Sequence, residues 1–120
     1  MIDIAVDEAY AFDMLSILAV KYDKTENEGN LKKFNLFESE IEQKVGKGLF
    51  YDVVVSMEYS NLYHANLKLF ELIDQIKTDD SIKAKKIDDL NYARWEAKRD
   101  LQKKFFNQEI KEVKIGYEQP

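Results

Sequence analysis

The sequence predicts an all-α protein, a bundle of four helices with the first helix at its centre. Three observations support this fold class. Apolar residues recur at the three- and four-residue spacing of helices along most of the 120 residues. Only one Pro and four Gly interrupt them, which favours long helices. Hydrophobic residues are 45% and charged residues 34% of the chain, which is typical of one globular domain, expected to cover residues 1–120.

The amino-terminal part contains two predicted elements. Residues 2–6 alternate between apolar and small or polar side chains, the pattern of a short strand. A helix is expected over residues 7–23, with Asp7 as its N-cap. Apolar side chains surround most of this helix, as is typical of a helix at the centre of a fold. Residues 25–30 are expected to form a loop, in which Gly29 breaks the helix and Asn30 caps the next one.

Three further helical segments are predicted from single apolar stripes. Residues 31–45 carry a narrow stripe, so this helix should pack on one side only, and Gly46 should end it. A long helix is expected over residues 49–77, with a kink or break near Ser56. The last helix is expected over residues 82–107. Residues 113–117 again alternate like a strand and could pair with residues 2–6.

Composition excludes several classes of protein. The formal net charge is −5, so binding to nucleic acid is not expected. The absence of Cys excludes a disulfide framework and a thiol nucleophile. The acidic start does not resemble a signal peptide, and no segment has the roughly 18 apolar residues of a membrane span. A cytoplasmic protein that has no membrane partner is therefore expected.

Polar residues occupy the apolar face of the last predicted helix. Asn91, Arg94 and Lys98 fall at positions i, i+3 and i+7, on the face that also carries Leu90 and Leu101. A buried cation is costly unless it is paired, because its charge loses contact with water. The sequence therefore predicts partners for Arg94 and Lys98 on neighbouring helices.

Two residues on other helices have the matching chemistry. Asp13 lies on an apolar face of the first helix and Asn66 on an apolar face of the long helix. Asp13 should pair with Arg94 or Lys98. Asn66 and Asn91 can donate and accept the remaining hydrogen bonds. The candidate site is therefore a predicted cluster of Asp13, Asn66, Asn91, Arg94 and Lys98.

This predicted cluster allows two interpretations. It can be a buried network that only fixes the register of the helices. It can also line a pocket, where two cations and one carboxylate leave one excess positive charge for a small anionic ligand. A metal site is not expected, because Cys is absent and His64, the one histidine, lies on an outer face of its helix. No cofactor is predicted.

Two functions follow from these interpretations. The first is a small non-catalytic accessory or binding protein, expected to be a homo-oligomer. The alternative is an all-helical enzyme acting on an anionic metabolite, either a sugar phosphate or a carboxylate. In that enzyme Arg94 and Lys98 would bind the anion, and Asp13 would act as a base.

Three blocks of sequence resemble a family of uncharacterised bacterial and phage proteins. They are the run from Phe12 to Lys21, the run from Asn66 to Lys77, and Asn91, Arg94, Lys98 and Arg99 followed by Glu112, Lys114 and Tyr117. Phe70 stands where the family usually has Trp, and residues 46–57 match no block. The family has no established activity. Its members are often encoded beside glycosyltransferases, so the resemblance implies a link with cell-surface polysaccharides.

Overall fold

The structure is a computed structural model that describes residues 6–76 and 84–106, and it contains five α-helices and no strand in these ranges. The helices are α1 (Glu8–Thr25), α2 (Glu28–Val45), α3 (Lys47–Val54), α4 (Met57–Ile76) and α5 (Ala84–Phe106). The predicted all-α class is confirmed. The predicted pairing of residues 2–6 with 113–117 lies outside the described residues, apart from Val6, and stays a prediction.

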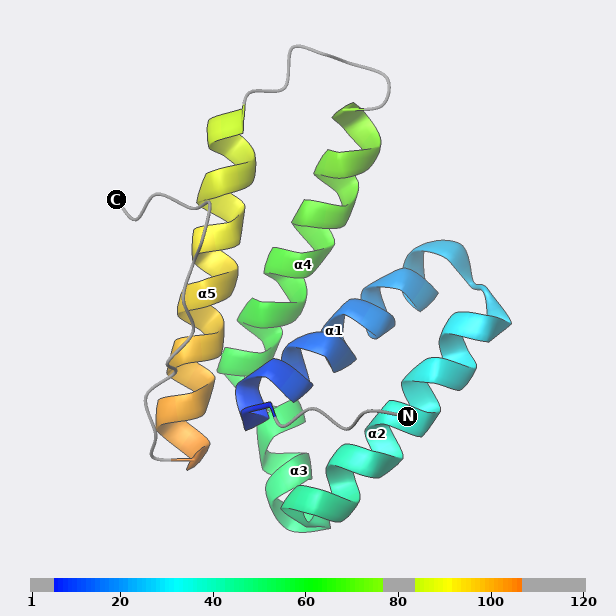
Figure 1. Cartoon of the computed structure of the whole chain (residues 1–120), viewed down its shortest axis with the longest axis vertical. Coiled ribbons are helices and arrows are strands. Elements are labelled where there is room, and N and C mark those ends of the chain that lie inside the picture. Colours follow the sequence, from blue (N-terminus) through cyan, green and yellow to red (C-terminus); the bar gives the residue numbers. More distant parts are fainter. Residues whose placement is uncertain (1–5, 77–83, 107–120) are drawn as a thin grey trace.

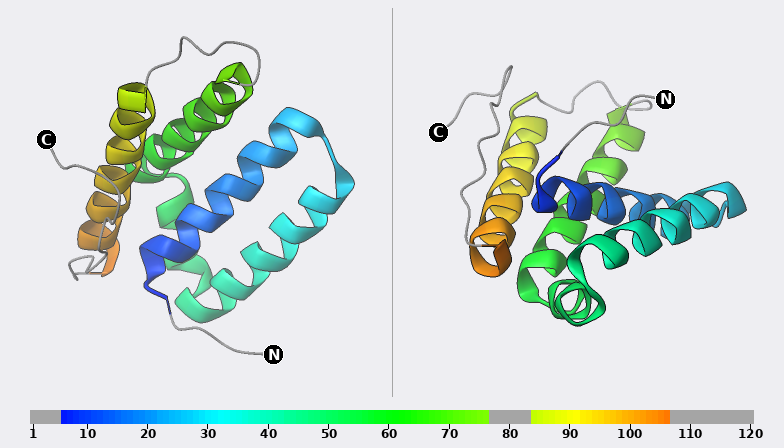
Figure 2. Two further views of the ribbon diagram at one scale, coloured as in Figure 1. Left: turned by 45° about the horizontal axis from the view of Figure 1, so that its top comes forward. Right: turned by 60° about the horizontal axis from the view of Figure 1, so that its bottom comes forward.

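Two antiparallel helical hairpins make up most of the fold (Figure 1). Helices α4 and α5 run side by side in opposite directions, and α1 and α2 form the other hairpin. Helix α1 lies between α2 and the α4–α5 hairpin and contacts all three (Figures 1 and 2). The short helix α3 joins the two hairpins at one end of the molecule. The described residues therefore form five helices where four were predicted, with α1 packed against each of the other long helices.

The helix predicted for residues 49–77 is wrong as a single element, although the break near Ser56 is confirmed. The chain forms α3, turns at Val55 and Ser56, and starts again as α4. The Ser56 hydroxyl donates to the Val53 carbonyl at 2.6 Å and accepts from the Tyr59 amide at 3.1 Å. A serine that satisfies the first amides of a helix is a typical N-cap. Ser56 thus ends one helix and starts the next.

The connection between α1 and α2 is shorter than predicted. Helix α2 begins at Glu28, and the side chain of Asn27, not Asn30, accepts from a first-turn amide. Glu26 takes the left-handed backbone conformation, with φ 52°, so Gly29 is not needed as a breaker and lies inside α2. Asp7 caps α1 as predicted. Gly46 ends α2 as predicted, with φ 91°.

The core is centred on Phe12 of α1, whose side chain is completely buried. Its ring lies 5.8 Å from the ring of Phe50, 6.3 Å from that of Tyr59 and 6.2 Å from that of Phe106, measured between centroids. Such aromatic contacts contribute beyond the area they bury. Phe12 joins α1 to α3, α4 and α5. It therefore fixes the face of α1 from which Asp13 and Ser16 reach toward the α4–α5 hairpin.

Candidate functional site

The Asp13 carboxylate connects α1, α4 and α5. Asp13 is completely buried. The Arg94 Nε donates to its two oxygens at 3.0 and 3.2 Å, and the Arg94 Nη2 also donates to Oδ2. The Asn66 Nδ2 donates to Oδ1 at 2.9 Å. A buried carboxylate with a two-pronged guanidinium partner is well compensated. Together with Asn66, this pair links three helices through side-chain hydrogen bonds.

Ser16 completes this arrangement. Its hydroxyl donates to the Asp13 backbone carbonyl at 2.7 Å and accepts from the Asn66 Nδ2 at 2.7 Å. Ser16 is completely buried, so its position depends on these two hydrogen bonds. Ser16 was not among the predicted site residues. The signal was present, because Ser16 follows Asp13 by three residues and therefore shares its helical face.

A second polar contact ties α5 to the start of α1. The Gln102 Oε1 accepts from the Ala9 amide at 2.8 Å, and its Nε2 donates to the Glu8 carboxylate at 2.9 Å. The first amides of a helix have no acceptor within the helix, so Gln102 of α5 supplies an acceptor for one of them. Gln102 is 1% exposed and was also missed. Its position, four residues after Lys98, continues the spacing of Asn91, Arg94 and Lys98.

An open groove borders the Asp13–Arg94 pair where α1, α4 and α5 meet. Its volume is about 350 Å³. We call it the three-helix groove, and its lining comprises Ile17, Val20 and Lys21 of α1, Asn66, Leu69, Phe70 and Ile73 of α4, and Ile87, Asn91 and Arg94 of α5. Most of the lining surface is therefore apolar, and the polar groups are two amides and two cations.

The structure divides the predicted cluster into two parts. Asp13, Asn66 and Arg94 form the buried contact described above, so the predicted pairing of Asp13 with Arg94 is present. Asn66, Asn91 and Arg94 also line the three-helix groove, whereas Asp13 and Lys98 do not. Lys98 is buried, with 3% exposure, one turn along α5 from Arg94. Three of the five predicted residues therefore line this groove, and Lys21 supplies its second cation.

Two tyrosines of α4 lie beside α1 and have shifted acidities. Burial raises the pKa of Tyr59 well above its ordinary value, and the negative charge of Glu38 adds to this effect. Tyr63 donates to the Asp23 carboxylate at 2.5 Å. This hydrogen bond, followed by burial, raises the pKa of Tyr63 to about 12. Both hydroxyls therefore stay protonated at neutral pH. Tyr63 is a hydrogen-bond donor that links the end of α1 to α4.

The described residues do not gather three His, Cys, Asp or Glu side chains that could hold a metal ion. None of the helices in residues 6–76 and 84–106 is long and apolar enough to cross a membrane. His64, predicted to lie on an outer face of its helix, is exposed. No family model, curated protein or solved structure matches this chain. The resemblance to the bacterial and phage family therefore stays a prediction.

Proposed function

We propose that the protein is a small non-catalytic binding protein that holds an amphipathic carboxylate in the three-helix groove. The observation that supports this most is the composition of the groove: its lining is mostly apolar and also contains the Arg94 side chain and the amides of Asn66 and Asn91. Ligand sites are typically concave and mostly apolar, with a few polar groups that fix orientation. A volume of about 350 Å³ lies within the range of such sites.

The charge around the groove favours an anionic head group. Lys21 and Arg94 contribute two positive charges to the lining, and Asp13 beneath Arg94 contributes one negative charge. The balance is one excess positive charge. Arg94 has 27% of its side chain exposed even though it pairs with Asp13, and it lines the groove. A ligand carboxylate placed between Lys21 and Arg94 would meet both cations.

The walls favour an apolar body over a sugar. Ile17, Val20, Leu69 and Ile87 offer no hydrogen bonds from their side chains to hydroxyl groups. A sugar phosphate would lose water against these walls without compensation, whereas an alkyl chain would gain from burial. Of the two ligand classes predicted from the sequence, the carboxylate fits these walls better, and the proposed ligand is a carboxylate with an alkyl tail.

The same geometry does not favour the enzyme alternative. Asp13, the predicted base, is completely buried and its two oxygens accept from Arg94 and Asn66. A general base must reach the proton that it removes. The titratable residues that line the groove, Lys21 and Arg94, are cations. The groove thus offers recognition of an anion without an accessible carboxylate for acid–base chemistry.

Calorimetric titration of the whole chain tests this function. Sodium decanoate, below its micelle concentration, is the ligand, with decanol as the neutral analogue and glucose 6-phosphate as the hydrophilic anion. We expect saturable binding of decanoate, weaker binding of decanol and none of glucose 6-phosphate. Lys21→Gln should weaken decanoate binding about threefold to tenfold and leave decanol unchanged, because only the charged head meets Lys21.

A matched pair of variants controls for nonspecific adsorption to exposed apolar residues. Ile73→Glu introduces a negative charge at the groove, where Ile73 is 52% exposed. Leu36→Glu makes the same kind of change on α2, where Leu36 is 69% exposed and is not part of the groove lining. Binding should be lost in Ile73→Glu and kept in Leu36→Glu. Equal loss in both variants, or no decanoate binding to the wild type, would contradict the proposal.

A further inference from the structure

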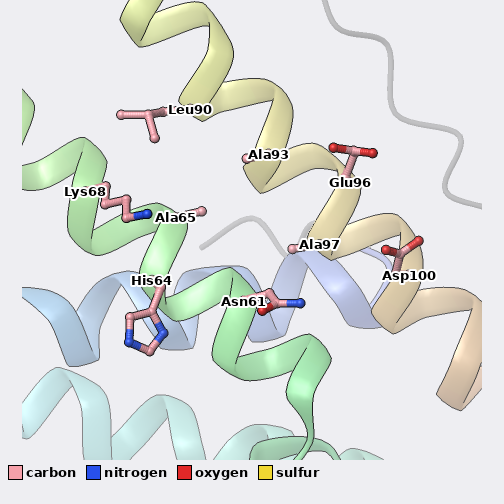
Figure 3. Close-up of a pocket in the computed structure, with 9 residues that line it drawn as sticks. All are labelled: Asn61, His64, Ala65, Lys68, Leu90, Ala93, Glu96, Ala97 and Asp100. Carbon is pink, nitrogen blue, oxygen red and sulfur yellow. The ribbon is translucent and has the colours of Figure 1, made fainter.

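A second groove lies on a different face of the α4–α5 hairpin (Figure 3). Its volume is also about 350 Å³. The floor contains Ala65 of α4 with Ala93 and Ala97 of α5, so we call it the alanine groove. Small side chains along two adjacent helices leave a hollow that larger side chains would fill. None of its lining residues belongs to the lining of the three-helix groove.

The two walls of the alanine groove carry opposite charge. Lys68 is exposed on the α4 wall, and Glu96 and Asp100 stand on the α5 wall (Figure 3). The side chains of Glu96 and Asp100 are 44% and 54% exposed. Arg99 lies 3.8 Å from the Glu96 carboxylate and 3.2 Å from that of Asp100. One cation next to two carboxylates leaves the α5 wall with a net negative charge, opposite to the α4 wall.

This distribution of charge is complementary to itself. A two-fold axis along the groove would place α4 of each copy over α5 of the other copy. Lys68 of one copy would then face Glu96 and Asp100 of the other, and the same contact would occur twice. The two α4–α5 hairpins would stack face to face as an antiparallel four-helix bundle, a common packing of helical hairpins. The alanine floor would let the hairpins approach closely.

From this complementarity we propose that the alanine groove is the contact surface between two copies of the chain. A partner of uniform charge, such as an acidic or a basic peptide, would be attracted by one wall and repelled by the other. A second copy satisfies both walls at once. The contact is mainly electrostatic, so it should be reversible and should weaken as salt is raised. It gives the homo-oligomer predicted from the sequence a defined surface, independent of any ligand in the three-helix groove.

Charge reversal combined with mixing tests this surface. Sedimentation velocity at low salt, over a wide range of protein concentration, should show dimers of the wild-type chain. Lys68→Glu alone should bring two carboxylates together at both contacts, and Glu96→Lys alone should bring two ammonium groups together. Each variant should raise the dissociation constant at least roughly tenfold, because two attractive pairs become repulsive.

An equimolar mixture of the two variants should recover dimers. In a mixed pair, each reversed residue meets its complement on the other copy, and the remaining Lys68 meets the remaining Glu96. Lys33→Glu and Glu40→Lys make the same charge changes at exposed positions of α2 and should leave dimerisation near the wild-type level. If Glu96→Lys fails to fold by circular dichroism, Asp100→Lys takes its place. A monomeric wild type at every concentration, or a mixture that stays monomeric, would overturn the proposal.

Discussion

Replacement of Arg94 by methionine should destabilise the protein strongly. The Asp13 carboxylate is 0% exposed and receives hydrogen bonds from the Arg94 Nε and Nη2 and from the Asn66 Nδ2. In Arg94→Met only the amide of Asn66 remains among these donors, so a buried negative charge loses the guanidinium that compensates it. Breaking a buried ion pair in this way costs about 3–5 kcal/mol. For a chain of this length, the melting temperature should fall by roughly 12–20 °C.

Thermal and urea unfolding at neutral pH measure this effect, with two controls. Arg99→Met removes an arginine of the same helix whose partners, Glu96 and Asp100, are at the surface, so it should cost less than about 1 kcal/mol. Adding Asp13→Asn to Arg94→Met removes the stranded charge and should recover part of the lost stability. If Arg94→Met were as mild as Arg99→Met, or if Asp13→Asn made it worse, the Asp13–Arg94 pair would not be the source of this stability.

Three further predictions concern the surroundings of the site. Gln102→Leu leaves the Ala9 amide buried without its acceptor and should cost about 1–3 kcal/mol in urea unfolding. Phe12→Ala empties the centre of the core and should cost about 3–5 kcal/mol in the same assay. The raised pKa of Tyr63, about 12 against 10.0 in the unfolded chain, contributes stability that is present below pH 10 and lost as the pH rises to 12. Tyr63→Phe should therefore lose less stability than wild type between these two pH values, and an equal loss in both proteins would show that the hydrogen bond to Asp23 has no such effect.

Much of the buried contact could be predicted from residue type and helical spacing alone. A carboxylate on one apolar face and cations on another must pair or stay uncompensated in the core, which is why a pairing of Asp13 with Arg94 or Lys98 could be expected. The residue of α5 that faces Asp13 depends on the point at which α1 crosses α5. Periodicity gives the buried face of each helix but not the position or angle of the crossing.

The groove could not be predicted for the same reason. Lys21 and Asn91 share its lining because of the way α1 lies against α4 and α5, and Lys21 alone looks like an ordinary surface residue. Ser16 and Gln102 could have been found, since each continues the spacing of a predicted cluster residue. The split of the long helix into α3 and α4 was expected near Ser56. The narrow apolar stripe of α2 indicates that this helix packs on one side only. Which helix it packs against depends on contacts between residues that are distant in the sequence.

The most direct test of binding in the three-helix groove is a methyl NMR titration with decanoate, using protein labelled at isoleucine methyl groups. Ile17, Ile73 and Ile87 line the groove, whereas Ile41 lies buried in the core outside it. We expect saturable chemical-shift changes at Ile17, Ile73 and Ile87, with Ile41 unchanged. Saturating decanoate that leaves these three methyl groups unchanged, or that shifts Ile41 equally, would contradict the proposed function.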